Sequence, residues 1–540
     1  MGFRGQTVAG AAAVVMAATV ASKILGFRRE AALAAVYGAS RVTDAYLVAA
    51  VIPTLLFALV GAAITTVGIP VLSEYLHREE KRGEFASLAW TSFHAVAGLL
   101  LGICVLAIPA AGLLVGLLAP GFDADQAALT AGMVRIMLPA IVFMGLAGWA
   151  QAVLNAHRHF LAPAAVGIPH NVILIAAIFL SGVFWGIEGV AWATVLAIAS
   201  QFFIQMPVLV KMGIRYRPVF DLRHPGLKKM AVLVLPVLVG VGAGQLNVIV
   251  DRILASGLAE GSISALNYAQ KALQIPQGLF AAPLIIVLYP ALAERGAVGD
   301  LDGFRERVSR GLGALAFLVA PVCVGVIVLR HELVAFLFQR GAFDATDAQM
   351  TAFALLFYTL GLLFLVWRDY LARAFYALQD TATPMWTGLA AVAVNIGLNL
   401  ILVRYLAHGG LALATSIAAL VGCALLLYLL RRRLGRVGGR YFLRETAKVL
   451  LAALVMGVAV WWGNAGLAAS RVWVAVADGD GAAGLCGEGG VATFVVLGLR
   501  LGLMAVLGAL VYVGVCKLLG VREMRYVLEM IRGAAARFRG

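Results

Sequence analysis

The sequence predicts an all-α polytopic membrane protein with about 14 transmembrane helices. Its 540 residues are 62% hydrophobic and only 13% charged, whereas soluble domains are about 45–50% apolar and about 25% charged. Apolar runs follow one another from Ala9 to Leu519 with short polar joints between them, and a spanning helix needs about 20 mostly apolar residues. The runs are continuous rather than alternating, which favours helices over a β-barrel.

Each predicted span is one apolar run between two polar joints. The first run, Val8 to Leu25, has a short basic start but no small-residue cleavage site, so we expect a retained helix rather than a signal peptide. The predicted spans are residues 6–36, 43–74, 85–117, 127–155, 161–183, 187–211, 228–256, 263–293, 309–337, 348–378, 384–405, 410–432, 446–465 and 492–519.

The joints alternate in charge along the chain. Those after even-numbered spans are rich in Lys and Arg, as in Arg431 to Arg433, and should be cytoplasmic. Those after odd-numbered spans are poor in both, so both termini are predicted to be cytoplasmic and the 466–491 loop, with Cys486, to lie outside. The joint after the first span breaks the rule with Arg28, Arg29 and Arg41. The basic tail 521–540 is either an amphipathic helix on the anionic inner leaflet or a solvated segment.

Several functional classes find no support in the sequence. The net charge of +15 falls in particular loops of a hydrophobic chain, which the positive-inside rule explains better than nucleic-acid binding. The five cysteines lie far apart and match neither a metal cluster nor a disulfide framework. We find no Walker A loop, GxSxG motif or paired-carboxylate motif, so we expect a transporter and not an enzyme.

Charged residues inside the predicted spans are the candidate functional groups, because a charge in a membrane normally faces a cavity or a partner. Cations predominate, and a cavity lined by Arg and Lys suits an anionic phosphate. The alternative is that they snorkel to the interface or form internal ion pairs, such as Arg29 with Glu30 or Asp44; for the cluster as a whole we favour function. These residues are Lys23, Arg28, Arg29, Glu30, Asp44, Asp251, Arg252, Lys271, Arg368, Asp369 and Arg373.

Motifs in order along about 400 residues resemble one family. The segment from Ser22 to Tyr75 begins SKILGFRRE and continues YGASRVTDAY; it is similar to the opening of MurJ (MviN) proteins, with S-R-x-L-G-F-x-R-[DE] followed by F-G-x-x-x-x-T-D-A-[FY]. Further matches are APGF at 119–122, LNAHRHFLAPA at 154–164, LPVLVG at 235–240, DRILASGLAEGSISALNYAQKALQIPQG at 251–278, LFQRGAF at 337–343 and RAFYALQDTATP at 373–384.

The resemblance implies a fold of the MOP exporter superfamily. Two six-helix lobes, 1–220 and 221–440, would surround a central cavity, and two extra helices in 441–520 would form a groove for a lipid tail. It also implies lipid II as the substrate, flipped by alternating access in the bacterial inner membrane. Membrane lipids and cell-wall synthesis proteins are the expected partners, and we expect a monomer.

The resemblance also carries over a set of substrate-binding residues: Ser22, Lys23, Arg29, Glu30, Asp44 and Lys271. Lys23 and Lys271 stand where many members have Arg, which keeps the charge but loses the planar fork. Phe57 and Gln274 occupy places where enteric-type members carry an Arg and a Glu. The details of how the substrate is held are therefore left open.

A second group of polar residues suggests an ion site. Asn395 and Asn399 are four residues apart and so share one helix face, and Asp251 and Thr415 add a carboxylate and a hydroxyl. Such hard oxygen ligands suit a small hard cation. The resemblance to MurJ proteins implies that these positions coincide with a sodium site of that family, although some members have Asp where this chain has Asn399. We expect Na⁺, or a proton on Asp251, as the coupling ion and no other cofactor; the alternative is that the asparagines only join helices and Asp251 pairs with a Lys or Arg.

Three alternative functions fit the sequence less well. A sister transporter, either a drug/cation antiporter or an O-antigen-type flippase, would share the fold, but a drug exporter should present acidic and aromatic groups. A non-transporting cell-wall scaffold would leave the charges within the spans without a role. A membrane enzyme acting on polyprenyl phosphates would need an acid/base or metal constellation, which we do not find.

Overall fold

The protein is described by a computed structural model covering residues 8–60, 62–435, 437, 439–469, 491–527 and 529. Within these ranges the chain is helical and contains no β-strand, so the all-α prediction is confirmed. The helices fall into two compact units, one ending at Ser264 and one beginning at Ala265. Cys486, most of the predicted outer loop, and residues 528 and 530–540 of the basic tail lie outside the described residues.

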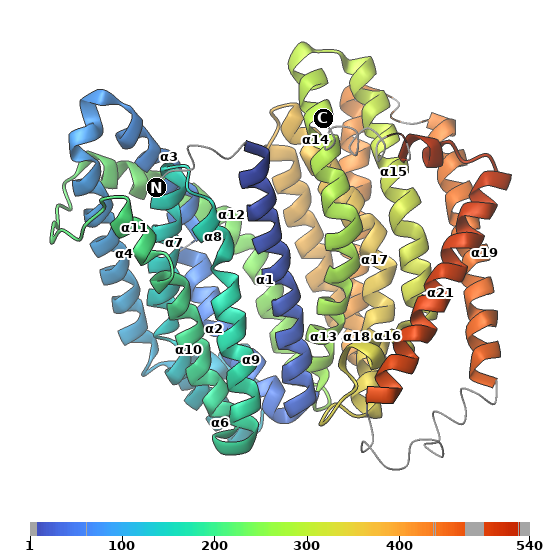
Figure 1. Ribbon diagram of the computed structural model, residues 1–540, viewed down its shortest axis with the longest axis horizontal. Helices are drawn as coiled ribbons and strands as arrows, with labels where there is room; N and C mark the ends of the chain where they lie inside the picture. Colours follow the sequence, from blue (N-terminus) through green and yellow to red (C-terminus); the bar gives the residue numbers. More distant parts are fainter. Residues whose placement is uncertain are drawn as a thin grey trace. The chain divides into compact units, whose positions relative to one another are not determined.

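The first unit contains the helices drawn in blue to green in Figure 1. They are α1 (Val8–Tyr37), α2 (Arg41–Val60), α3 (Ala62–His77), the 3₁₀ helix η1 (Glu79–Glu84), α4 (Phe85–Ala107), α5 (Ala111–Leu118), α6 (Ala124–Met137), α7 (Ala140–Ala156), α8 (Leu161–Ala165), α9 (Gly167–Phe184), α10 (Gly186–Phe203), α11 (Met206–Lys211) and α12 (Pro225–Ser256).

The second unit begins within α13 and contains the remaining helices, of which α19 and α21 lie against each other (Figure 1). They are α13 (Ser262–Pro276), the π-helical turn η2 (Gln277–Ala281), α14 (Ala282–Val298), α15 (Leu301–Val328), α16 (Arg330–Phe338), α17 (Ala345–Ala377), α18 (Ala382–Leu434), α19 (Gly439–Ala469) and α21 (Val491–Leu518).

The helix starts and breaks have local causes. Asp123, Asp300 and Asp344 each accept a hydrogen bond from a backbone N–H three residues on and so cap α6, α15 and α17. The bond from the Gly303 N–H, together with Arg295, holds the pKa of Asp300 below its ordinary value. Several predicted spans are two consecutive helices, and Pro139, for example, separates α6 from α7.

Two predicted spans, 384–405 and 410–432, form α18 with one sharp turn between them. The turn is at Ala407, whose φ of 47° and ψ of −129° are not helical. The sequence gives little sign of so tight a turn, because the left-handed residue is an alanine and the glycines Gly409 and Gly410 follow it.

Eleven helices of the described residues are long and apolar enough to cross a membrane. α18 is counted once among them although it contains two predicted spans, and neither α1 nor α12 is included. A multi-span membrane protein is therefore confirmed, whereas the count of 14 stays a prediction.

Contacts between the joints agree with the predicted alternation of odd- and even-numbered joints between the two ends of the helices. In the first unit, the joints after the first and seventh spans meet where the Arg41 N–H donates to Glu260 Oε1 at 2.8 Å. The joints after the second and sixth spans meet where Lys229 Nζ lies 2.5 Å from Glu74 Oε2. Odd-numbered joints thus contact odd-numbered joints, and even-numbered ones contact even-numbered ones.

The second unit follows the same pattern. Arg433 and Asp380, near the joints after the twelfth and tenth spans, form an ion pair at 2.8 Å. Asn464 and Glu332, near the joints after the thirteenth and ninth spans, are hydrogen-bonded at 2.6 Å. This is the pairing of ends expected when each segment runs from one end of its unit to the other.

Candidate functional site

Arg29 is the most extensively bonded cation of the predicted site. It lies on α1, and its Nη2 donates to Glu30 Oε1 at 2.6 Å in an ion pair. Its Nη1 lies 3.2 Å from both His170 Nε2 and Asn171 Oδ1 on α9. The Arg29 side chain is 25% exposed and that of Glu30 only 7%. Of the two ion pairs weighed from the sequence, the one with Glu30 forms, while Asp44 bonds elsewhere.

Close packing of α1 on α9 fixes this arrangement. Asn171 Nδ2 donates to the carbonyl of Ser22 at 3.1 Å and to that of Gly167 at 2.8 Å. A Cβ at Gly167 would lie 1.9 Å from Ser22 Oγ, so only glycine allows the helices to approach this closely. Ser22 thus lies at this helix contact, and its contact with substrate stays a prediction.

Lys23 and Arg28 differ from Arg29 in being exposed on the first unit. A long side chain with an exposed charged end can reach an anion without first breaking an ion pair. The structure therefore places two exposed cations and one oriented cation on the same helix.

Asp44 is a buried carboxylate whose hydrogen bonds go to the α12–α13 turn, and its contact with substrate stays a prediction. It is only 3% exposed at the start of α2 and accepts hydrogen bonds from the Gly261 N–H at 2.9 Å, the Ser264 N–H at 2.7 Å and Ser264 Oγ at 2.5 Å. Gly261 has a φ of +79°, and a Cβ there would lie 2.1 Å from the Ala39 carbonyl. Asp44 therefore anchors the α12–α13 turn to the start of α2.

The second unit carries Lys271 on α13 and further charges on α17. Lys271 is half-buried and lies six residues before η2. Arg368 lies 3.5 Å from Asp369, and the Arg373 guanidinium lies 5.7 Å from the Tyr289 ring centre. Phe57 in the first unit is half-buried and Gln274 in the second is exposed.

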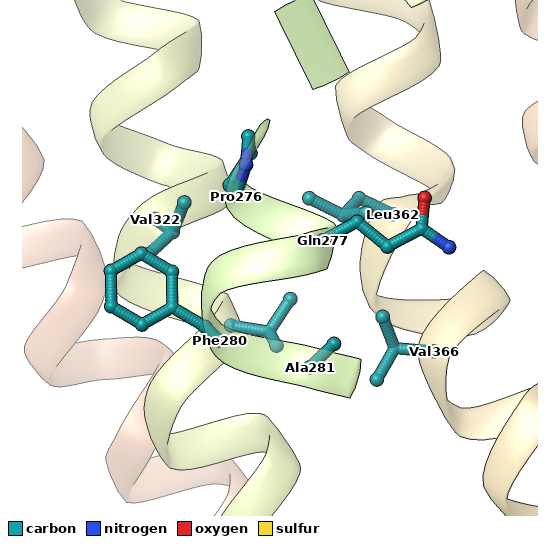
Figure 2. Close-up of a pocket in the computed structure, with 8 residues that line it drawn as sticks. Pro276, Gln277, Phe280, Ala281, Val322, Leu362 and Val366 are labelled. Carbon is teal, nitrogen blue, oxygen red and sulfur yellow. The ribbon is translucent and has the colours of Figure 1, made fainter. Parts of the chain in front are cut away.

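Next to η2 lies a shallow apolar crevice (Figure 2). Pro276 lacks a backbone N–H, which helps to explain the departure from α-helical bonding here. The crevice is lined by Pro276, Gln277, Phe280, Ala281, Val319, Val322, Leu362 and Val366.

Three of the four predicted ion ligands lie together on α18. Asn395 and Asn399 are 1% and 0% exposed. Asn399 Nδ2 donates to Asn395 Oδ1 at 2.9 Å, and Asn395 Nδ2 donates to Thr415 Oγ1 at 3.3 Å. The fourth, Asp251, is half-buried on α12 in the first unit, and its part in an ion site stays a prediction.

The oxygen atoms on α18 are chemically suited to sodium, but Asn395 Oδ1 and Thr415 Oγ1 already accept internal hydrogen bonds. Amide and hydroxyl oxygens are hard ligands, and the described residues contain no group of three His, Cys, Asp or Glu arranged to hold a metal. The same contacts equally match the alternative in which the asparagines join the two halves of α18.

Sequence reasoning missed the residues around Arg29. His170, Asn171 and Gln201 are polar residues inside apolar helices, which is the signal that could have identified them. In the structure His170 contacts Arg29 and Gln201.

A second, half-buried polar cluster was also missed. Arg500 on α21 donates from Nε to Asn464 Oδ1 of α19 at 2.7 Å and lies 3.4 Å from Glu332 Oε1 of α16. An arginine nine residues into the last apolar run is the corresponding signal in the sequence.

Comparisons with known proteins agree with the resemblance. The family model described as "Lipid II flippase MurJ" matches residues 33–475. The "Lipid II flippase MurJ" of Burkholderia cenocepacia is 32% identical over 455 residues, which cover 82% of this chain and 88% of that protein. The "Probable lipid II flippase MurJ" of Vibrio cholerae is 32% identical over 465 residues, covering 83% and 88%.

Solved structures show the same fold. "Lipid II flippase MurJ, inward closed conformation" matches with a TM-score of 0.75 at 25% identity, covering 93% of this chain and 98% of that one. An inward-facing multidrug resistance MATE transporter of the MOP superfamily matches with a TM-score of 0.64 at 13% identity, covering 78% of this chain, which shows shared fold alone. The chain is therefore a multi-span membrane transporter that belongs to the MurJ family of lipid II flippases.

Proposed function

We propose that this protein flips lipid II, the undecaprenyl-pyrophosphate-linked disaccharide-peptide, from the cytoplasmic to the periplasmic leaflet of the inner membrane by alternating access. The observation that carries the proposal is the family match over residues 33–475, together with relatives aligned over 88% of their own length. The basic character of α1 supports an anionic substrate.

The pyrophosphate is the part of the substrate that the cations would bind. Lys23 and Arg28 are exposed, while Arg29 presents a guanidinium already oriented by Glu30 and α9. An oriented arginine loses less conformational freedom on binding than a free one. Lys271 of the second unit would add a further cation.

Closure of the periplasmic end would use Asp44. Three donors from Gly261 and Ser264 converge on its buried carboxylate, and the joints involved follow odd-numbered spans, which the charge pattern places outside. For the outer end to open, this anchor would have to release the α12–α13 turn. The same charge pattern would place both termini on the cytoplasmic side.

The lipid tail would lie along α19 and α21. These helices contact each other and carry stripes of large exposed apolar side chains at helical spacing. The stripes are Leu454, Val458 and Trp461 on α19 and Leu503, Val506 and Leu510 on α21.

Transport would be coupled to an ion. Asp251, Asn395, Asn399 and Thr415 would bind Na⁺, or Asp251 would bind a proton. The inward membrane potential, worth about 2.3 kcal/mol per charge per 100 mV, could then reset the carrier.

The test is conditional depletion of a bacterium's own lipid II flippase with this chain as the only replacement. Growth and continued lipid II export are expected. Failure of the expressed and inserted chain to support either would favour a sister transporter of the superfamily.

A further inference from the structure

His170 on α9 connects Arg29 to a third helix. Its Nε2 lies 3.2 Å from Arg29 Nη1, and its Nδ1 lies 3.0 Å from Gln201 Nε2 on α10. Arg29, His170 and Gln201 thus form a chain of contacts from α1 through α9 to α10.

The chemistry of these groups fixes the protonation of the imidazole. A guanidinium can only donate hydrogen bonds, so Nε2 must accept and carries no proton. A neutral imidazole carries one N–H, so its proton is on Nδ1. The Gln201 amide, whose Nε2 is the atom placed against Nδ1, must then be turned so that its oxygen accepts from the ring.

The same contacts determine which part of the guanidinium remains available. Arginine has five N–H donors. Those on Nη1 face His170 and Asn171, and one on Nη2 faces Glu30. Within the described part of the chain, these contacts leave Nε–H and one Nη2–H, each of which can donate to a phosphate oxygen.

We propose that His170, held by Gln201, is a positioning residue that orients the Arg29 guanidinium toward the pyrophosphate of the substrate. This inference rests on the proposed function. Because His170 acts as an acceptor, it must stay neutral: a proton on Nε2 would remove the bond and place a second positive charge beside Arg29. The other titratable groups facing this cluster are Glu30 on α1 and Tyr46 on α2.

Two substitutions separate positioning from simple packing. His170→Phe keeps a ring but has no acceptor, and we expect lipid II export to fall about tenfold or more, as for loss of a bond to a charged group. His170→Gln places an amide oxygen near the position of Nε2 and should recover most of the export. Val172→Ala, at a 50% exposed position on the same helix, is the control and should match the wild type.

The pH profile is the readout that a packing role would not change. Wild-type export should fall as the medium is acidified and His170 takes up a proton, and His170→Gln should not show this fall. Inserted protein is measured for each variant, so that loss of folding is recognised. Wild-type export by His170→Phe, or equal acid sensitivity of His170→Gln, would overturn the inference.

A measurement that does not depend on transport tests the protonation directly. In ¹⁵N-histidine-labelled protein, the His170 signal, assigned by its loss in His170→Gln, should be that of the neutral Nδ1–H tautomer at pH 7. An Nε2–H tautomer or a charged ring would refute the inference even if the protein flips lipid II. Absence of export by the wild type with the expected tautomer would instead reject the proposed function.

Discussion

Arg29 and its neighbours Lys23 and Arg28 have the same charge but different surroundings. Arg29 is fixed by Glu30 and α9, while the other two are exposed. The sequence predicted a cationic group on this helix, but it could not tell which cation is oriented, because the partners His170 and Asn171 lie more than 140 residues away along the chain.

Replacing Arg29 should stop transport. Arg29→Ala removes charge-assisted contacts to pyrophosphate worth roughly 1.5–3 kcal/mol each, so lipid II export should be abolished at normal insertion. Lys23→Ala and Lys271→Ala should be comparably damaging, whereas Lys23→Arg keeps the charge and should remain active. Export is measured in cells that depend on the variant, and full activity of Arg29→Ala would mean that the residue only pairs with Glu30.

Asp44 is predicted to hold the α12–α13 turn. In Asp44→Ala the Gly261 and Ser264 amides lose a buried acceptor, at a cost of about 1–3 kcal/mol for each donor left unsatisfied. Hydrogen exchange of residues 261–264 should therefore speed up at least about tenfold, with a smaller effect for Asp44→Asn, which keeps one acceptor oxygen. Unchanged exchange in Asp44→Ala would show that the turn is held by other contacts.

At the scale of helices, the apolar runs predicted the segments well because burial in a membrane requires length and hydrophobicity. The breaks within them were harder to predict, since they depend on local backbone geometry. Pro139 gave a readable signal at the α6–α7 break. Ala407 did not, because alanine is a good helix former and only its tertiary surroundings hold it at positive φ.

The turn at Ala407 should be relieved by glycine. Glycine adopts positive φ without the steric cost paid by an L-residue, so Ala407→Gly should stabilise the protein by about 1 kcal/mol. Ala393→Gly, at an exposed helical position of α18, should instead destabilise it by about 0.5–1 kcal/mol. Thermal unfolding in detergent compares the two; a lower melting temperature for Ala407→Gly would contradict the explanation.

The start of the C-terminal tail is docked rather than solvated. Val521 and Val527 are 3% and 4% exposed, and Glu523 is 7% exposed. The Arg522 N–H donates to Glu445 Oε2 of α19 at 3.1 Å, and Lys448 pairs with Glu445. Burial, with Glu445 nearby, raises the pKa of Glu523 to about 7.

Docking of this segment should weaken as the pH rises. A carboxyl with a raised pKa in the docked state binds a proton more tightly there than in the undocked state. The contribution of Glu523 to the stability of docking is therefore complete below the ordinary pKa of about 4.3 and is lost as the pH passes about 7. Hydrogen-exchange protection of residues 521–527 should fall on the order of tenfold between pH 5 and pH 8, after correction for intrinsic exchange. Glu523→Gln should remove this dependence, and a pH-independent wild type would contradict the prediction.

At the scale of the whole molecule, the sequence predicted the fold class and the family because apolar runs and a long series of motifs can both be recognised in short stretches of sequence. The comparisons confirm both. The predicted lobe boundaries, the central cavity and the site joining Asp251 to Asn395 depend on how distant helices assemble, and they stay predictions.

The central claim is that this chain moves lipid II across the membrane. The most direct measurement places the chain as the only flippase in spheroplasts and follows cleavage of lipid II by an externally added enzyme. Cleavage is expected with the wild type and should be lost with inserted Arg29→Ala. Lipid II that stays protected with the inserted wild-type chain, while a known family member exposes it, would contradict the claim.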